Sequence, residues 1–185
     1  MKARILSSLR KFLIIWGAFS LVAIVGLGAF VAYQLTFGNK SQTNTASAQD
    51  VWFILNWCEL GEGRIEKVVH SYTSSRSFTG DHMDAHEIKI SHLEIPELAA
   101  RDLDRTDRWY RGDQLPPVVD DAIAFVGAWD GSDRIPWFPK ESELRSANIY
   151  VFPVSICTHG VRPTAVELIF VRPSDNTVFY FGSKT

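Results

Sequence analysis

The sequence predicts an α+β protein: an N-terminal transmembrane helix, then a small domain with an antiparallel sheet of about five strands and two or three helices packed on one face of that sheet. Two observations lead to this prediction. Residues 12–37 carry no formal charge, and the C-terminal third contains three strand-like segments separated by turn residues. The 185 residues leave room for one globular domain beside the helix.

The uncharged segment at residues 12–37 is 26 residues long, and a membrane-spanning helix needs about 20. Trp16 and Tyr33 lie near its two ends, about 25 Å apart along a helix, which suits one aromatic residue at each face of a bilayer. A cleavable signal peptide is the alternative, because residues 46–48 have the small-x-small form of a cleavage site. Since the apolar core of a signal peptide has only about 7 to 15 residues, the sequence favours a retained signal anchor.

The charges on either side of this segment predict its orientation. Four basic residues precede it: Lys2, Arg4, Arg10 and Lys11. Only Lys40 follows it closely, so the positive-inside rule places residues 1–11 in the cytoplasm and the domain outside the cell membrane. In a bacterium with two membranes, that compartment is the periplasm. Gly28 and Ala32 form a small-x-x-x-small pair, which allows homo-oligomerisation through the anchor.

Residues 38–49 are small and polar, with no aliphatic side chain larger than alanine, and are expected to form a flexible tether to an extracytoplasmic domain at residues 50–185. In residues 51–185, 14 lysine and arginine residues stand against 20 aspartate and glutamate residues, which gives a net charge of −6. Nucleic acids and anionic lipid headgroups both require basic surfaces. The composition therefore argues against nucleic acid as a partner.

The first part of the domain is expected to contain a helix and a hairpin. Residues 51–60 are apolar on nearly every side, so a buried strand competes with a buried helix, and Asp50 as an N-cap favours the helix. Residues 64–92 are expected to form a β-hairpin, because Ile88 and Ile90 alternate with polar residues after a turn signal. The first arm of that hairpin also fits helical spacing.

Two helices and three strands are expected in the remainder. Pro96 opens a short helix and Pro117 a longer amphipathic one, because proline is favoured in the first helical turn. The strand segments follow at residues 148–158, 164–171 and 177–181. The turns between them are short, so neighbouring strands are expected to be antiparallel.

A group of potential metal ligands lies in the second arm of the predicted hairpin. On a strand, His82, Asp84 and His86 point to the same side, and imidazole and carboxylate groups bind divalent cations. Ile88 and Ile90 share this parity, so the alternative is that the histidines are polar residues of a core-facing strand. The sequence contains no His-Glu-x-x-His or Cys-x-x-Cys motif that would support a metal site.

Trp109, Tyr110 and Arg111 are adjacent in an expected loop, and they are the residue types most enriched at binding hot spots. They are therefore the candidate anchor for a protein partner. The alternative is that Trp109 folds into the core and Arg111 pairs with a nearby aspartate. Trp137 and Phe138, held between two prolines, are expected to cap the core.

Both cysteines, Cys58 and Cys157, fall in the domain that is expected to lie in an oxidising compartment. A disulfide between them would close a loop of about 100 residues. The alternative is two buried thiols, since unpaired cysteine is among the most buried residue types. The sequence leaves both alternatives open.

The sequence favours a non-catalytic interaction module that binds a membrane-proximal protein, such as an accessory subunit or a toxin-neutralising protein. The short tether, the acidic domain and the Trp109–Arg111 loop support this function. The alternative is a membrane-anchored metal-dependent or other hydrolase that uses His82, Asp84 and His86. No cofactor is expected, because Gly61 and Gly63 lack the further glycines and the lysine of a phosphate-binding loop.

Overall fold

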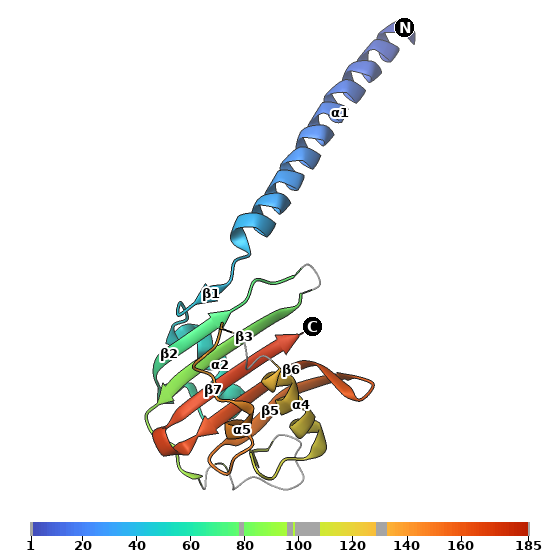
Figure 1. Ribbon diagram of the computed structural model, residues 1–185. Helices are drawn as coiled ribbons and strands as arrows, with labels where there is room; N and C mark the ends of the chain where they lie inside the picture. The colour runs from blue at the N-terminus through green and yellow to red at the C-terminus, as the bar shows by residue number, and fades with distance from the viewer. Residues whose placement is uncertain (1, 78–79, 96–97, 99–107, 129–132, 185) are drawn as a thin grey trace. The chain divides into compact units, whose positions relative to one another are not determined.

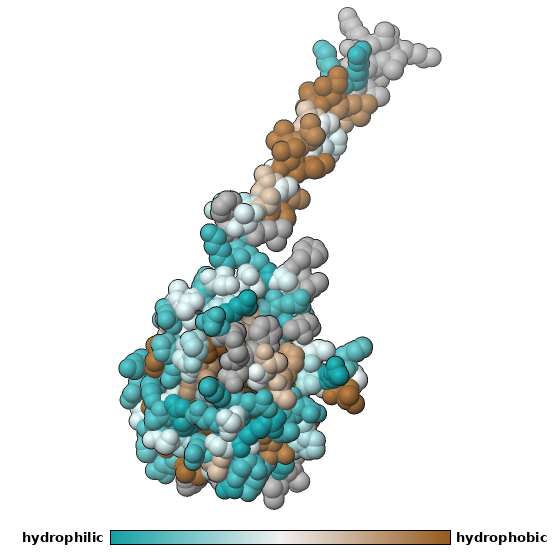
Figure 2. All heavy atoms as spheres, in the orientation of Figure 1, coloured by the Kyte–Doolittle hydropathy of each residue, from teal (hydrophilic) through white to brown (hydrophobic). Residues whose placement is uncertain are grey.

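The computed structural model describes residues 2–77, 80–95, 98, 108–128 and 133–184, and it divides into two compact units. The first unit, Met1–Lys40, contains helix α1 (Lys2–Tyr33) and a π-helical turn (Gln34–Gly38). Within α1, Arg10–Tyr33 is long and apolar enough to cross a membrane, and its most apolar window has no buried residue. Figure 2 shows hydrophobic side chains over much of this helix. The helix expected at residues 12–37 is therefore present as a candidate membrane span.

The second unit, Ser41–Thr185, is built on an antiparallel sheet, with seven strands in the described residues in the order β1-β2-β3-β7-β6-β5-β4 (Figure 1). The strands are β1 (Gln42–Thr43), β2 (Ile65–Thr73), β3 (His82–Ile90), β4 (Tyr110–Arg111), β5 (Tyr150–His159), β6 (Arg162–Arg172) and β7 (Thr177–Lys184). The expected hairpin is confirmed as β2 and β3, and the three expected C-terminal strands as β5, β6 and β7. Strand β7 lies between β3 and β6 and joins the two ends of the domain into a continuous sheet.

The sequence predicts too few strands, about five instead of seven. The two additional strands, β1 and β4, have two residues each and lie at opposite edges of the sheet. Two residues cannot show the apolar–polar alternation by which a strand is recognised in a sequence. Both form by pairing with a longer strand: Thr43 lies opposite Tyr72, and Tyr110 lies opposite Val151.

Helices cover both faces of the sheet, whereas the sequence predicts one covered face (Figure 1). Helix α2 (Ala48–Trp57) packs on the face that carries Ile88 and Ile90. Helices α4 (Pro117–Gly127) and α5 (Glu141–Leu144) pack on the face of Met83 and Ala85. Strand β7 shows the result, because every residue of it except the last is buried. A strand that is buried along its whole length has both faces covered.

Two of the three expected helices are confirmed. The interpretation of residues 51–60 as a helix is confirmed by α2, and α4 begins at Pro117 as expected. The short helix expected from Pro96 falls mainly on residues outside those that the structure describes.

The domain begins earlier than the sequence predicts. Helix α2 starts at Ala48, and its cap is Ser47, whose backbone N–H and hydroxyl both donate to Asp50 Oδ2 at 2.7 Å. Before the cap, the Asn44 N–H donates to the Ser71 carbonyl at 2.8 Å, and the Ser71 N–H donates to Asn44 Oδ1 at 3.1 Å. Most of the segment expected to be a tether therefore belongs to the compact domain.

The expected core cap is confirmed for Phe138. Its ring packs edge-on against Phe170, Phe179 and Phe181, with centroid distances of 5.7 to 5.9 Å. These three rings come from the central strands β6 and β7 and are buried on the face covered by α4. Trp137 is half-buried against the same cluster.

Candidate functional site

The three predicted metal ligands share one face of β3, but only two of them come close together. His82 Nε2 lies 3.9 Å from Asp84 Oδ2. His82 Nδ1 hydrogen-bonds to the Gly80 carbonyl at 2.8 Å, which orients the ring. His86 is buried farther along the strand and stacks on Tyr180. Among the described residues, no three His, Cys, Asp or Glu side chains are grouped as a metal centre.

Asp84 and His86 line a polar cavity of about 490 Å³, which we call the Asp84 pocket. Its lining residues come from the segment leading into α2, from α2 itself, from strands β1 to β3 and from the segment after β2: Gln42, Thr45, Ala46, Asp50, Phe53, Thr73, Arg76, Asp84 and His86. The buried and half-buried members include Phe53, Asp84 and His86, whereas Asp50 and Arg76 are exposed. The pocket therefore has a polar interior and a charged rim.

Asp84 Oδ1 and His86 Nδ1 are closed to solvent, and within the described part of the chain neither atom has a hydrogen-bond partner of good geometry. Burial lowers the pKa of His86 to about 4, opposed by the negative charge of Asp50. Burial also raises the pKa of Asp84, and the guanidinium of Arg76 opposes that shift.

Helix α2 exposes two tryptophan side chains, Trp52 at 47% and Trp57 at 41%. Trp57 is held by an edge-on contact with Phe53, with 4.6 Å between ring centroids. Trp52 borders a second cavity of about 630 Å³, which we call the Trp52 pocket. Its lining residues are Ala48, Gln49, Trp52, Glu62, Gly63 and Ile65.

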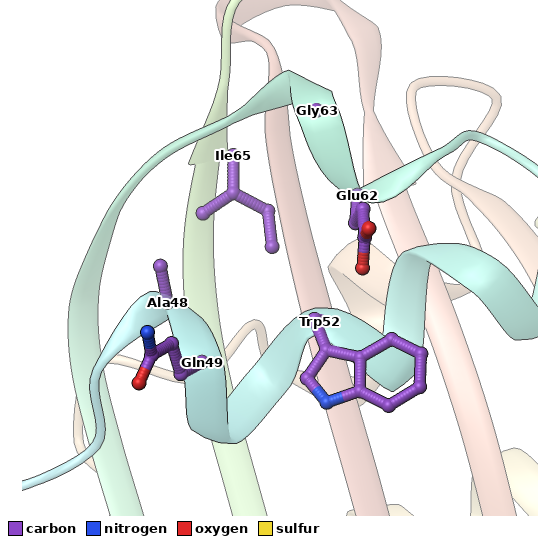
Figure 3. Close-up of a pocket in the computed structure, with 6 residues that line it drawn as sticks. All are labelled: Ala48, Gln49, Trp52, Glu62, Gly63 and Ile65. Atoms are coloured by element: carbon purple, nitrogen blue, oxygen red, sulfur yellow. The ribbon is translucent and has the colours of Figure 1, made fainter.

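In the Trp52 pocket, the Glu62 carboxylate and the Trp52 ring point into the same space (Figure 3). Trp52 comes from α2, and Glu62 opens the short 3-10 turn (Glu62–Arg64) that leads into β2. Ile65 adds an apolar wall. An aromatic face attracts cations through its quadrupole, and a carboxylate attracts them through its charge. This combination is suited to a cationic group with an apolar stem, such as a lysine or arginine side chain.

The predicted anchor at Trp109, Tyr110 and Arg111 is largely engaged within the domain. Trp109 is only 8% exposed, and its ring lies 5.3 Å from that of Phe152. Arg111 donates from Nε to Asp113 Oδ1 at 2.5 Å and from Nη2 to Oδ2 at 3.0 Å. Tyr110 is half-buried in β4. This geometry matches the alternative in which the tryptophan joins the core and the arginine pairs locally.

The two exposed tryptophans of α2 are not evident from the sequence, because a segment that is apolar on nearly every side does not show which face is buried. One signal was available. Gln49, Trp52 and Asn56 are spaced three and four residues apart, which places Trp52 on a helical stripe with two polar residues. All three are exposed in the structure.

The two cysteines are not bonded to each other. Cys58 is fully buried at the end of α2, and its thiol donates to the Leu55 carbonyl at 3.5 Å. Cys157 is exposed on β5. The disulfide that the sequence allows is therefore absent, and Cys58 instead packs in the core beneath α2.

Comparison with known proteins gives no match to a family model, a curated protein or a solved structure. The residue roles proposed below therefore rest on the geometry of the Trp52 pocket and the exposed face of α2.

Proposed function

We propose that the protein is a non-catalytic, membrane-anchored binding module, with its domain on the non-cytoplasmic side, and that the domain binds a protein partner through its α2 surface. The α2 surface consists of Trp52, Trp57 and Glu62. The observation that carries the proposal is the exposed Trp52 ring beside Glu62 at a cavity. The partner is expected to place a basic side chain in that cavity.

The exposure of the two tryptophans supports a binding role. Tryptophan is among the residue types most enriched at binding hot spots. The opposite side of α2 is fixed in the core by Val51, Ile54 and Leu55, so both rings are presented on a rigid element. Large rings with few rotatable bonds lose little conformational entropy when a partner covers them.

The charge of the domain supports a basic partner. A net charge of −6 over residues 51–185 attracts a basic surface and accelerates its association. A cation–π contact at an exposed site contributes about 0.5–1 kcal/mol, and an exposed ion pair about 0.2–1 kcal/mol. Glu62 is therefore expected to give specificity, whereas burial of the Trp52 and Trp57 rings gives most of the affinity.

The short connection to the anchor supports a partner in or near the same membrane. The compact domain starts at Ser41, and residues 34–40 alone separate it from the end of α1. A short connection keeps the domain and other proteins of that membrane at a high effective concentration. The basic residues before the span support the orientation with the domain outside.

Site-specific photocrosslinking in native membranes tests the proposal. A photoreactive residue replaces Gln49, an exposed residue that lines the Trp52 pocket, in the full-length chain. We expect one discrete crosslinked adduct. Its yield should fall about tenfold or more in Trp52→Ala, as for a hot-spot residue, and by a smaller factor in Glu62→Gln.

The matched control places the photoreactive residue at Val161, which is 87% exposed in the turn between β5 and β6 and should give no such adduct. Val118→Ala, at a half-exposed position on α4, should leave the yield at Gln49 unchanged. Two outcomes contradict the proposal: no adduct at Gln49, or an adduct whose yield is the same with and without the Trp52 ring.

A further inference from the structure

We infer that the Trp52 pocket is selective for arginine, so that the partner inserts a guanidinium group rather than the ammonium group of a lysine. The inference rests on the proposed function, in which the partner presents a basic side chain to the α2 surface, and it names that side chain. Three features of the pocket carry it: a carboxylate, an open indole face and an apolar wall.

The carboxylate of Glu62 is available to a ligand. Among the described residues that line the pocket, Glu62 is the one charged side chain. Within the described ranges, Glu62 forms no ion pair and its side chain forms no hydrogen bond. Arg64, the nearest basic residue in the sequence, donates from Nη1 to the His92 carbonyl at 3.1 Å instead. The pocket therefore presents a negative charge that no neighbouring cation of the described chain neutralises.

The face of the Trp52 indole is open. The side chain is 47% exposed, and in the part of the chain that the structure describes it makes no ring stacking or cation–π contact. Trp57, in contrast, has ring contacts with Phe53 and Tyr180. Figure 3 shows the Trp52 ring nearly face-on, with the Glu62 carboxylate beyond the edge of the ring rather than over its face. One ligand can therefore use the ring face and the carboxylate together.

A guanidinium group suits this arrangement better than an ammonium group does. Because a guanidinium is planar, it can stack flat on an aromatic face and donate two parallel N–H bonds to a carboxylate in its own plane. It is also weakly hydrated, so it loses little hydration on the ring. An ammonium group is a compact, strongly hydrated point charge without this fork of donors. Arginine is accordingly the more frequent cation in cation–π contacts.

The apolar wall suits the stem of an arginine side chain. Ile65 and Ala48 line the pocket beside Trp52 (Figure 3). Long basic side chains bury their methylene groups on such surfaces and keep the charged head in contact with water or a carboxylate. The cavity of about 630 Å³ has the size that is usual for small-molecule sites, so it can hold a whole arginine side chain.

An NMR titration of the full-length chain in detergent micelles tests the inference without the partner. The indole N–H resonance of Trp52, assigned with Trp52→Phe, reports on the pocket, and that of Trp57 is the internal reference. The probe is N-acetyl-arginine amide. It is compared, at constant ionic strength, with N-acetyl-lysine amide and with N-acetyl-citrulline amide, which has nearly the shape of arginine but no charge.

We expect the arginine probe to shift the Trp52 resonance along a binding isotherm. Its Kd should be lower than that of the lysine probe by a factor of about three or more, because the planar cation uses the ring and the carboxylate together. The citrulline probe should give no such shift, because it lacks the positive charge. The Trp57 resonance should stay in place with all three probes.

Two variants isolate the role of the carboxylate. Glu62→Gln keeps nearly the same shape but removes the charge, and it should raise the Kd of the arginine probe about two- to fivefold, as expected for an exposed ion pair. Asp121→Asn is the matched control. It removes one negative charge from an exposed position of α4, on the opposite face of the sheet, and should leave that Kd unchanged.

The possible failures of the inference and of the proposed function differ. Equal Kd values for the arginine and lysine probes would overturn the inference and leave the basic partner in place. No saturable shift with either probe, together with an adduct at Gln49 that depends on Trp52, would overturn it as well and would show that the partner uses the pocket without a basic side chain. Arginine-selective binding without any adduct at Gln49 would support the inference and contradict the proposed protein partner.

Discussion

Phe181→Ala is expected to lower the free energy of unfolding of the domain by about 3–5 kcal/mol. Phe181 is fully buried in the central strand β7, and its ring lies 5.7 Å from that of Phe138. Removal of the ring leaves a cavity bounded by strands that pair on both sides, so the backbone cannot close it. Phe138 loses its edge-on ring contact with Phe181 at the same time.

Chemical denaturation of the full-length chain in micelles, followed by tryptophan fluorescence, measures this loss. Val118→Ala is the matched control, because it truncates a half-exposed side chain on α4 and should change the free energy by less than about 0.5 kcal/mol. A loss below about 1 kcal/mol for Phe181→Ala would show that the ring does not occupy the closed core described above.

Between pH 7 and pH 4, the wild-type domain is expected to lose about 3 kcal/mol of stability that a His86→Gln variant does not lose. The pKa of His86 falls from 6.5 to about 4 on folding because the ring is buried. Below pH 6.5 the unfolded chain binds a proton at this position, whereas the folded chain stays neutral until about pH 4. The contribution of neutral His86 to the free energy of unfolding is therefore present at pH 7 and is lost as the pH falls from 6.5 to about 4.

The measurement is the difference in unfolding free energy between wild type and His86→Gln at each pH, which removes the contributions of other groups. Val118→Ala, which removes no titratable group and lies at a half-exposed position on α4, is the control, and its difference from wild type should not vary with pH. A wild-type advantage that stays constant from pH 7 to pH 4 would contradict a buried, neutral His86.

The elements that could be predicted from the sequence are those with a local signal of their own. Residues 82–90 alternate clearly, and Pro117 marks the start of α4, so both elements were predicted. Strands β1 and β4 have no such signal, because they exist only through pairing with β2 and β5. The second covered face was missed for a similar reason: continuous burial of β7 depends on what packs on either side of the sheet.

The candidate sites show the same limit. The parity of β3 correctly placed Asp84 and His86 on one side, but parity could not show that α2 encloses them and leaves a polar cavity. Trp109 and Arg111 were predicted to be an exposed anchor because of their residue types, but residue types in a loop do not show whether a side chain is buried. Trp109 is buried in the structure. The exposure of Trp52 depends on which side of α2 packs on the sheet. The sequence does not specify that side, because the helix is apolar on nearly all sides.

The proposed module depends most directly on the side of the membrane that the domain occupies, and labelling of Cys157 measures it. Cys157 is exposed, whereas Cys58 is fully buried, so the native chain offers one reactive position in the folded domain. A membrane-impermeant maleimide is added to right-side-out vesicles, with Cys157→Ser as the control. The proposal predicts labelling of the wild-type chain without detergent and none in the control. Labelling that appears only after the membrane is dissolved would place the domain in the cytoplasm and contradict the proposed function.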